Sequence, residues 1–358
     1  MRTARPLPSF LVLCTIPAGL LLTGAYQGLS SRSLDAAETP RVRLIATGGT
    51  IATRPGGARI SADELLDSVP GLHRYVRAES EQFSNVPSTA LAVEQWLQLA
   101  RRINDLFADD QSLAGVVVTA GTDTLEELAY FLHLTVRTSR PVVLVGSMRT
   151  AGTPGYDGPA NLLSAFRAAA DDSSTGKGVL VVMNDEINSA RDVVKTDAQR
   201  LNTFQSRHYG VLGVVDPDRV LFYRQPVKRH TVRSEFDVRS MLELPRVDIV
   251  LFYQGATPDL VRAAVDLGAK GLVLAVAGAD TTAGSLSAGL SYAAKQRVPV
   301  VLSTRTGEGR IAAPGGDAAF ADYIAGEDLS PLKARILLAL ALTRTHSQPE
   351  LQRVFREY

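Results

Sequence analysis

From residue 42 onward, short apolar runs alternate with longer stretches in which apolar residues recur every three or four positions. The runs are rich in β-branched residues and do not alternate with polar ones, which is typical of parallel strands covered on both faces. They predict strands at Val42–Thr47, Val116–Thr119, Val142–Gly146, Val179–Met183, Val247–Tyr253, Leu272–Ala277 and Val300–Ser303.

The amphipathic stretches between these runs predict helices. Ser330 and Pro331 offer the last of them a capping hydroxyl and then a proline at the first helical position. Strands that alternate with helices indicate an α/β architecture built on parallel sheets. The helices are expected at Val93–Phe107, Leu125–Arg137, Pro159–Ala170, Pro258–Leu267, Ser285–Lys295 and Pro331–Thr343.

A polar and charged stretch near Lys228–Leu244 separates two series of strands and helices. We therefore expect an N-terminal α/β domain at residues 41–230, a linker at 231–244 and a smaller C-terminal α/β domain at 245–358. A chain of 358 residues is long enough for two hydrophobic cores.

The first 40 residues have a different character. Two arginines precede an apolar stretch, Phe10–Leu22, and small and polar residues follow it to Pro40. This order predicts a signal peptide and polar leader at 1–40, and a periplasmic or secreted protein without stable membrane insertion after signal removal. An uncleaved membrane anchor is the alternative. Because the only cysteine, Cys14, lies in the apolar stretch, the exported chain would have no disulfide.

Composition excludes several classes of function. The formal net charge is only +1 and basic residues are spread along the chain, so neither nucleic acid nor an acidic membrane surface is an expected partner. The five histidines lie far apart in the sequence, and none of them forms a pattern with ligand spacing. We therefore expect no metal site.

Two turns at the carboxyl ends of predicted strands are the first candidates for chemistry, because ligands of open α/β sheets bind at that edge. In the turn Ala46–Ile51, two glycines allow a tight bend directly before the hydroxyl of Thr50. In the turn Thr119–Thr124, Thr122 offers a second hydroxyl and Asp123 a charged contact for a ligand.

Each of these turns also has a purely structural explanation. The glycine turn can be a plain bend with a solvated Thr50. In the second turn, Asp123 or Thr124 can cap the following helix, with Glu126 or Glu127 completing a capping box.

A third segment, Arg191–Thr196, contains Lys195. A lysine is usually a solvated surface charge. A buried lysine is different, because burial disfavours the charged form and leaves an amine that can accept a proton. A hydroxyl beside such an amine becomes a usable nucleophile or proton relay.

Taken together, the segments resemble the signature segments of bacterial type II L-asparaginases and glutaminase-asparaginases. The resemblance rests on ATGGTIA, GTDTLEELAYFL, PVVLVGSMR with YDGPANLLSA, VLVVMNDEI and ARDVVKT, in the same order and at the same spacing. It covers essentially all of residues 41–358. It implies an α/β, two-domain asparaginase-like fold, with a larger N-terminal catalytic domain on a mostly parallel sheet and a smaller C-terminal α/β domain. It also implies a homotetramer with sites at subunit interfaces, a small-molecule amide substrate, and no metal or organic cofactor.

The resemblance implies roles for single residues. Thr50 is expected to attack the side-chain amide of L-asparagine, forming an acyl-enzyme and releasing ammonia. Thr122, Asp123 and Lys195 are expected to form the supporting hydroxyl–carboxylate–lysine group, and Asp123 is also expected to bind the substrate α-ammonium group. The substrate-binding residues that it implies are Gly49, Ser88, Thr89, Gly121 and Asp123.

The sequence departs from the family around the expected nucleophile. The family has a mobile loop there that carries a tyrosine. Here the segment Thr53–Arg59 is short, and no tyrosine occurs between Thr50 and Tyr75. What activates Thr50 is therefore left open. Ala120 also stands where the family usually has a histidine.

Other departures affect groups that recognise the ends of a free amino acid. Thr89 and Ala90 stand where glutamine and aspartate are usual. Gly278–Thr281 replaces a G-N-G-N stretch, and no glutamate stands at the place near Gly315 and Gly316 where the family has one. These changes favour a shifted substrate, such as L-glutamine or another amide. A non-hydrolytic binding protein on the same scaffold is the alternative from a different class.

Overall fold

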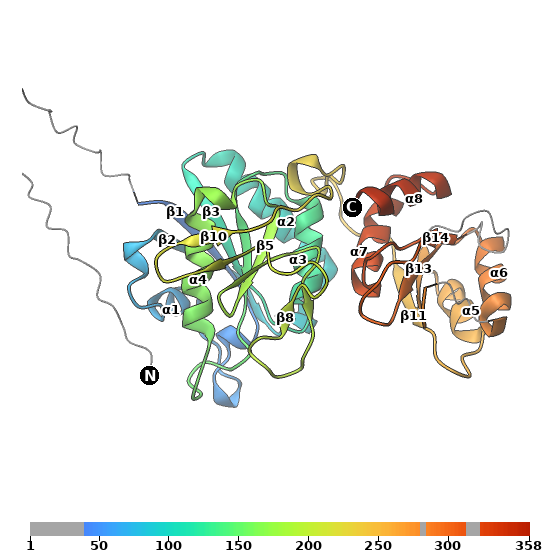
Figure 1. Cartoon of the computed structure of the whole chain (residues 1–358), viewed down its shortest axis with the longest axis horizontal. Coiled ribbons are helices and arrows are strands. Elements are labelled where there is room, and N and C mark those ends of the chain that lie inside the picture. Colours follow the sequence, from blue (N-terminus) through green and yellow to red (C-terminus); the bar gives the residue numbers. More distant parts are fainter. Residues whose placement is uncertain (1–38, 280–283, 313–322) are drawn as a thin grey trace, which may run out of the picture. The chain divides into compact units, whose positions relative to one another are not determined.

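The structure is a computed structural model that describes residues 39–279, 284–312 and 323–358 (Figure 1). The predicted signal peptide and leader therefore lie outside the described residues, apart from Thr39 and Pro40. Within the described residues, no helix combines the length and the apolar character needed to cross a membrane.

The larger sheet has eight strands in the order β10-β9-β6-β5-β4-β3-β1-β2. Strands β2, β1, β3, β4 and β5 are parallel, whereas β6, β9 and β10 continue the sheet in antiparallel pairs. This arrangement confirms the mostly parallel sheet that the apolar runs predicted. The bounds are β1 Arg41–Gly48, β2 Arg77–Val86, β3 Leu113–Thr119, β4 Val142–Val145, β5 Val179–Met183, β6 Glu186–Ser189, β9 Gly213–Val215 and β10 Val220–Phe222.

Four helices accompany this sheet: α1 Ala62–Asp67, α2 Val93–Asp109, α3 Leu125–Thr135 and α4 Gly158–Ala170. Helix α4 packs on β3, β4 and β5, while α3 packs on β5 and α2. Every residue of α3 except Glu127 is buried, so this helix is enclosed on all sides. A short hairpin of β7 (Val194–Lys195) and β8 (Phe204–Gln205) forms a separate two-stranded sheet.

The second sheet is fully parallel, in the order β11-β12-β13-β14. Helix α7 packs on β11, β12 and β13, and also on α3 of the larger sheet. It is therefore apolar nearly all round. The bounds are β11 Val247–Leu251, α5 Asp259–Asp266, β12 Gly271–Val276, α6 Ser287–Lys295, β13 Val300–Thr304, β14 Tyr323–Ala325, α7 Pro331–Leu342 and α8 Gln348–Glu357.

All seven predicted strands and all six predicted helices are confirmed, with ends that differ by a few residues. The predicted cap of α7 is also confirmed, because the Ser330 hydroxyl accepts from the Lys333 N–H at 3.4 Å and proline follows. The pattern missed β2, whose sequence RAESEQFSNV is polar. An edge strand can carry such a sequence, because one of its sides has no neighbouring strand.

The stretch expected to be a linker contains no α-helix or β-strand, and one 3-10 turn, η6 (Thr231–Arg233), within its described residues. It is nevertheless packed into the protein, since Phe236 and Val238 are buried in the main hydrophobic core. This segment therefore contributes to the core.

Candidate active site

The turn after β1 is built on two glycines. Gly48 and Gly49 have φ angles of 106° and 85°, in the left-handed region that favours glycine. A Cβ atom on Gly49 would lie 2.3 Å from the Cα of Gly121, so a side chain cannot fit there. Thr50 follows directly and begins the 3-10 turn η1 (Thr50–Ala52).

The close approach of Gly49 to Gly121 joins the ends of β1 and β3. The Thr47 hydroxyl donates to the Thr119 carbonyl at 2.7 Å and holds these two strands together. Because Thr50 follows Gly49 and Thr122 follows Gly121, both threonines lie at the carboxyl ends of the neighbouring strands β1 and β3. Within the described residues, the Thr50 hydroxyl has no hydrogen-bond partner.

Ser88, a predicted substrate-binding residue, follows strand β2 and lies beside the same two glycines. The Gly49 N–H donates to the Val86 carbonyl at 3.0 Å. A Cβ on Gly121 would lie 2.8 Å from the Oγ of Ser88, so Ser88 packs against this glycine. Gly49, Gly121 and Ser88 are therefore neighbours. Thr89, the next residue of the 3-10 turn η4 (Ser88–Ala90), is exposed.

The predicted hydroxyl–carboxylate–lysine group is assembled in the structure. The Nζ atom of Lys195 donates to Thr122 Oγ1 at 3.0 Å and to Asp123 Oδ1 at 2.7 Å. Thr122 is buried, and the Lys195 side chain is only 16% exposed, so the solvated-lysine alternative is wrong. The Asp123 side chain is 69% exposed and can meet a ligand from the solvent side.

The capping alternative for the second turn is also wrong. Thr124 occupies the N-cap position of α3, but its side chain makes no capping hydrogen bond. Glu126, considered as a capping-box partner, is buried instead, and burial raises the pKa of its carboxyl. The backbone N–H of Lys195 and the ammonium of Lys333 oppose this rise.

Lys333, which the sequence did not indicate as a site residue, supports the segment that carries Lys195. Its Nζ atom donates to the carbonyls of Arg191 and Val193, at 2.7 and 2.5 Å. The side chain is fully buried, and this burial lowers its pKa to about 8. A sequence signal existed, because Lys333 is the single lysine in the otherwise apolar face of α7, which packs on β11–β13 and on α3.

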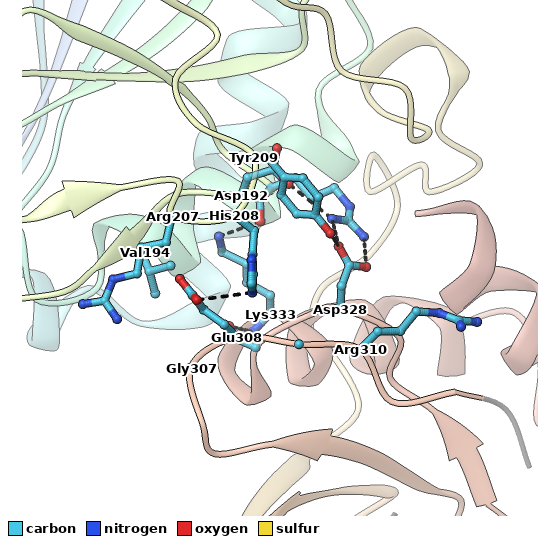
Figure 2. Close-up of a pocket in the computed structure, with 13 residues that line it drawn as sticks. Asp192, Val194, Arg207, His208, Tyr209, Gly307, Glu308, Arg310, Asp328 and Lys333 are labelled. Carbon is cyan, nitrogen blue, oxygen red and sulfur yellow. Dashed lines mark hydrogen bonds and ion pairs between the residues drawn. The ribbon is translucent and has the colours of Figure 1, made fainter. Parts of the chain in front are cut away.

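A pocket of about 340 Å³ lies beside β7 (Figure 2). Val194 lines it, while the neighbouring Lys195 reaches Thr122, as expected for alternating positions of a strand. Inside it, Arg191 makes a bidentate ion pair with Asp328 at 2.8 and 2.7 Å. The Tyr209 hydroxyl donates to the same carboxylate at 2.8 Å. The ion pair thus connects Arg191, four residues before Lys195, to Asp328, three residues before α7 begins.

The structure bears only in part on two further predictions, which concern a metal site and the C-terminal departures from the family. Within the described stretches of the chain, no group of three or more histidine, cysteine or acidic side chains is arranged to hold a metal ion. Of the C-terminal departures, Asp280 and Thr281 and the pair Gly315–Gly316 lie outside the described residues.

Two protein-family descriptions match this chain. The family description "Asparaginase, N-terminal" matches residues 41–228, and "Glutaminase/Asparaginase C-terminal domain" matches residues 246–355. The two matches cover the larger sheet with its hairpin, and the fully parallel sheet with its helices.

Individual relatives are similar over most of their length. L-asparaginase 2 of Bacillus subtilis is 41% identical over 92% of this chain and 89% of its own. L-asparaginase 2 of Escherichia coli is 39% identical over 94% of this chain and 98% of its own. The crystal structure of a probable cytoplasmic L-asparaginase from Campylobacter jejuni, 39% identical, matches 89% of this chain and all of its own with a TM-score of 0.84.

The fold and the relatives define an amide-hydrolysing enzyme on a two-domain α/β scaffold. The chain belongs to the asparaginase family, which includes the glutaminase-asparaginases.

Proposed function

We propose that this protein hydrolyses the side-chain amide of L-asparagine to L-aspartate and ammonia, with Thr50 as the nucleophile of an acyl-enzyme mechanism. The relatives named L-asparaginase 2, at 39–41% identity, support this substrate. A relative from Pseudomonas fluorescens at 39% identity is named glutaminase-asparaginase, which supports L-glutamine as a second substrate.

The observation that carries the proposal is the contact of Lys195 with both Thr122 and Asp123, beside the backbone contact of Gly49 with Gly121. This arrangement brings two hydroxyls, an amine and a carboxylate to one sheet edge. Amide hydrolysis needs a nucleophile, a group that moves its proton, and an anchor for the substrate.

The reaction would proceed in two stages. The Oγ atom of Thr50 bonds to the amide carbon, and the hydroxyl proton passes through the Thr122–Lys195 pair to the leaving nitrogen. The carbon–nitrogen bond then breaks and ammonia departs. A water molecule attacks the resulting ester, releases the carboxylic acid and restores the Thr50 hydroxyl.

Backbone amides would stabilise the oxyanion that forms on the amide oxygen. Within the described residues, the N–H groups of Gly121 and Thr122 have no hydrogen-bond acceptor. Both lie at the sheet edge beside the Thr50 turn. A donor aimed at a developing oxyanion contributes about 3 kcal/mol to lowering the barrier.

Recognition of the amino acid would rest on Asp123 and Ser88. One oxygen of the Asp123 carboxylate accepts from Lys195, and the exposed carboxylate leaves its other oxygen for the substrate α-ammonium group. Ser88, Gly49, Gly121 and Thr89 would surround the rest of the substrate. The exposed Thr89, in place of the usual glutamine, supports a shifted preference among amides.

The test compares Thr50→Ala with Thr50→Ser in assays of ammonia release from L-asparagine, L-glutamine and an N-substituted amide. We expect Thr50→Ala to lose at least about a thousand-fold in kcat, and Thr50→Ser to retain part of the activity because it keeps a hydroxyl. Unchanged turnover in Thr50→Ala would refute the nucleophile. Substrate binding without ammonia release by the unaltered protein would favour the binding-protein alternative.

We also propose export, homotetrameric assembly with sites at subunit interfaces, and the domain division 41–230, 231–244 and 245–358. The family matches at 41–228 and 246–355 support the division. For location the relatives differ. One from Haemophilus influenzae is named a probable periplasmic L-asparaginase, and the Campylobacter jejuni structure is called cytoplasmic. N-terminal sequencing of the mature protein tests the export, and sedimentation analysis tests the assembly.

A further inference from the structure

The loop between β4 and α4 contacts the turn that carries Thr50. The hydroxyl of Tyr156 donates to the carbonyl of Ile51 at 2.7 Å. The N–H of Ala151 donates to the carbonyl of Thr53 at 2.8 Å. Two points of one loop therefore hold the backbone immediately after the proposed nucleophile.

The loop is itself held by side-chain hydrogen bonds. The carboxylate of Asp157 accepts from the N–H groups of Met148 and Arg149, both at 3.0 Å. It also accepts from the side-chain amide of Asn161, one turn into α4, at 2.9 Å. Asp157 therefore closes the loop at its base, and the position of the adjacent Tyr156 is defined by α4.

The position of the Tyr156 ring depends on the absence of a side chain at Gly158. A Cβ atom on Gly158 would lie 2.2 Å from both Cζ and Oη of the ring. The ring therefore occupies the space above the first residue of α4. Burial, together with the charge of Asp157, raises the pKa of the Tyr156 phenol to about 12. The phenol consequently stays protonated, and remains a donor, throughout the neutral pH range.

The carbonyl of Gly49, directly before Thr50, also accepts hydrogen bonds from side chains. The Thr53 hydroxyl donates to the Gly49 carbonyl at 2.7 Å. The Arg59 guanidinium donates to the same carbonyl at 3.2 Å and to Thr53 Oγ1 at 2.7 Å. The carbonyls of the two residues next to Thr50, Gly49 and Ile51, thus both accept hydrogen bonds from side chains.

We propose that Tyr156 is a positioning residue for Thr50, acting through the Ile51 carbonyl. This inference rests on the proposed role of Thr50. A 3-10 turn of three residues has little internal hydrogen bonding, so its orientation depends on contacts with its surroundings. The Tyr156 hydroxyl supplies such a contact from a loop whose base is fixed, and orients the Thr50 hydroxyl toward the Gly121–Thr122 turn.

The first test is Tyr156→Phe, with Tyr358→Phe as the matched control. Tyr358 is also buried, and its hydroxyl accepts one backbone hydrogen bond, from the Glu235 N–H at 2.7 Å, but it lies outside the proposed active site. We expect Tyr156→Phe to lower kcat about ten-fold with KM within two-fold, because nucleophilic attack depends on precise orientation. Tyr358→Phe should leave both constants unchanged. A wild-type kcat in Tyr156→Phe would overturn the proposal.

The second test is a double-mutant cycle between Gly158→Ala and Tyr156→Ala. Gly158→Ala should lower kcat about as much as Tyr156→Phe, because its Cβ displaces the ring. In the Tyr156→Ala background the same change should have no further effect, since the ring is absent. Independent, additive losses would overturn the proposal. If Thr50→Ala keeps its turnover, the proposed function fails. If Thr50→Ala is inactive while Tyr156→Phe is unimpaired, only the role of Tyr156 fails.

Discussion

Substitution of Lys333 by methionine gives a quantitative prediction about the buried support of Lys195. Methionine has a similar length and no charge. The change removes the two hydrogen bonds from Nζ to the carbonyls of Arg191 and Val193, at 2.7 and 2.5 Å. It also removes the ammonium that opposes the raised pKa of Glu126.

The magnitude follows from the pKa of Lys333. Burial lowers it from 10.5, its ordinary value, to about 8 in the folded protein. The gap corresponds to about 3 kcal/mol. Between these two values the unfolded chain binds more protons than the folded one, so the free energy of unfolding rises with pH. This contribution is complete above about pH 10.5 and is lost as the pH falls through about 8.

The assay is urea unfolding of the wild-type protein and Lys333→Met between pH 7 and 9.5. Protein concentration is kept constant, because assembly adds a concentration-dependent stability. We expect the wild-type free energy of unfolding to rise relative to that of Lys333→Met by about 2 kcal/mol over this range. Lys295→Met, at an exposed position on α6, is the control and should follow the wild type.

The same variant also tests the link to catalysis. Without the donors on the Arg191 and Val193 carbonyls, β7 is held less firmly and Lys195 is displaced from Thr122. We expect kcat to fall at least ten-fold at pH 7. Parallel pH dependences of unfolding for wild type and Lys333→Met, together with an unchanged kcat, would refute the reasoning.

Two further predictions concern the buried histidine pair and the glycines on either side of Thr50. His133 and His230 lie 4.9 Å apart between ring centroids, and burial lowers the pKa of His230 to about 4 and that of His133 well below its ordinary value. The stabilisation by neutral His230 is present above about pH 6.5 and is lost as the pH falls through about 4. The free energy of unfolding of His230→Gln should therefore fall less than that of the wild type in this window, as measured by circular dichroism during urea unfolding. Gly49→Ala should abolish activity and lower Tm, because its Cβ would lie 2.3 Å from the Cα of Gly121. Gly56→Ala has nearly the same φ angle, 84°, but open space around it, so it should cost only about 1 kcal/mol and keep kcat. Equal losses in the two glycine variants would contradict this contrast.

The sequence by itself determined the elements that bury continuous apolar surface. The β-branched runs identified the central strands, and the helical periodicity identified six of the eight α-helices in the described residues, all except α1 and α8. The glycines before Thr50 and the order of the signature segments also indicated the chemistry at the carboxyl edge of the sheet. These features are local, because burial on both faces and a left-handed φ each restrict the residue at a single position.

The tertiary structure decided which distant groups meet. The polar strand β2 pairs with β1 as the edge strand of the larger sheet. This pairing brings Ser88, which follows β2, to Gly121. The support of Lys195 by Lys333 joins positions far apart in the chain, and so does the contact of Tyr156 with Ile51. Each depends on contacts between segments that the packing of sheets and helices places together. Local periodicity records whether a position is buried, but a hydrogen bond also requires a partner, and only the folded arrangement supplies it.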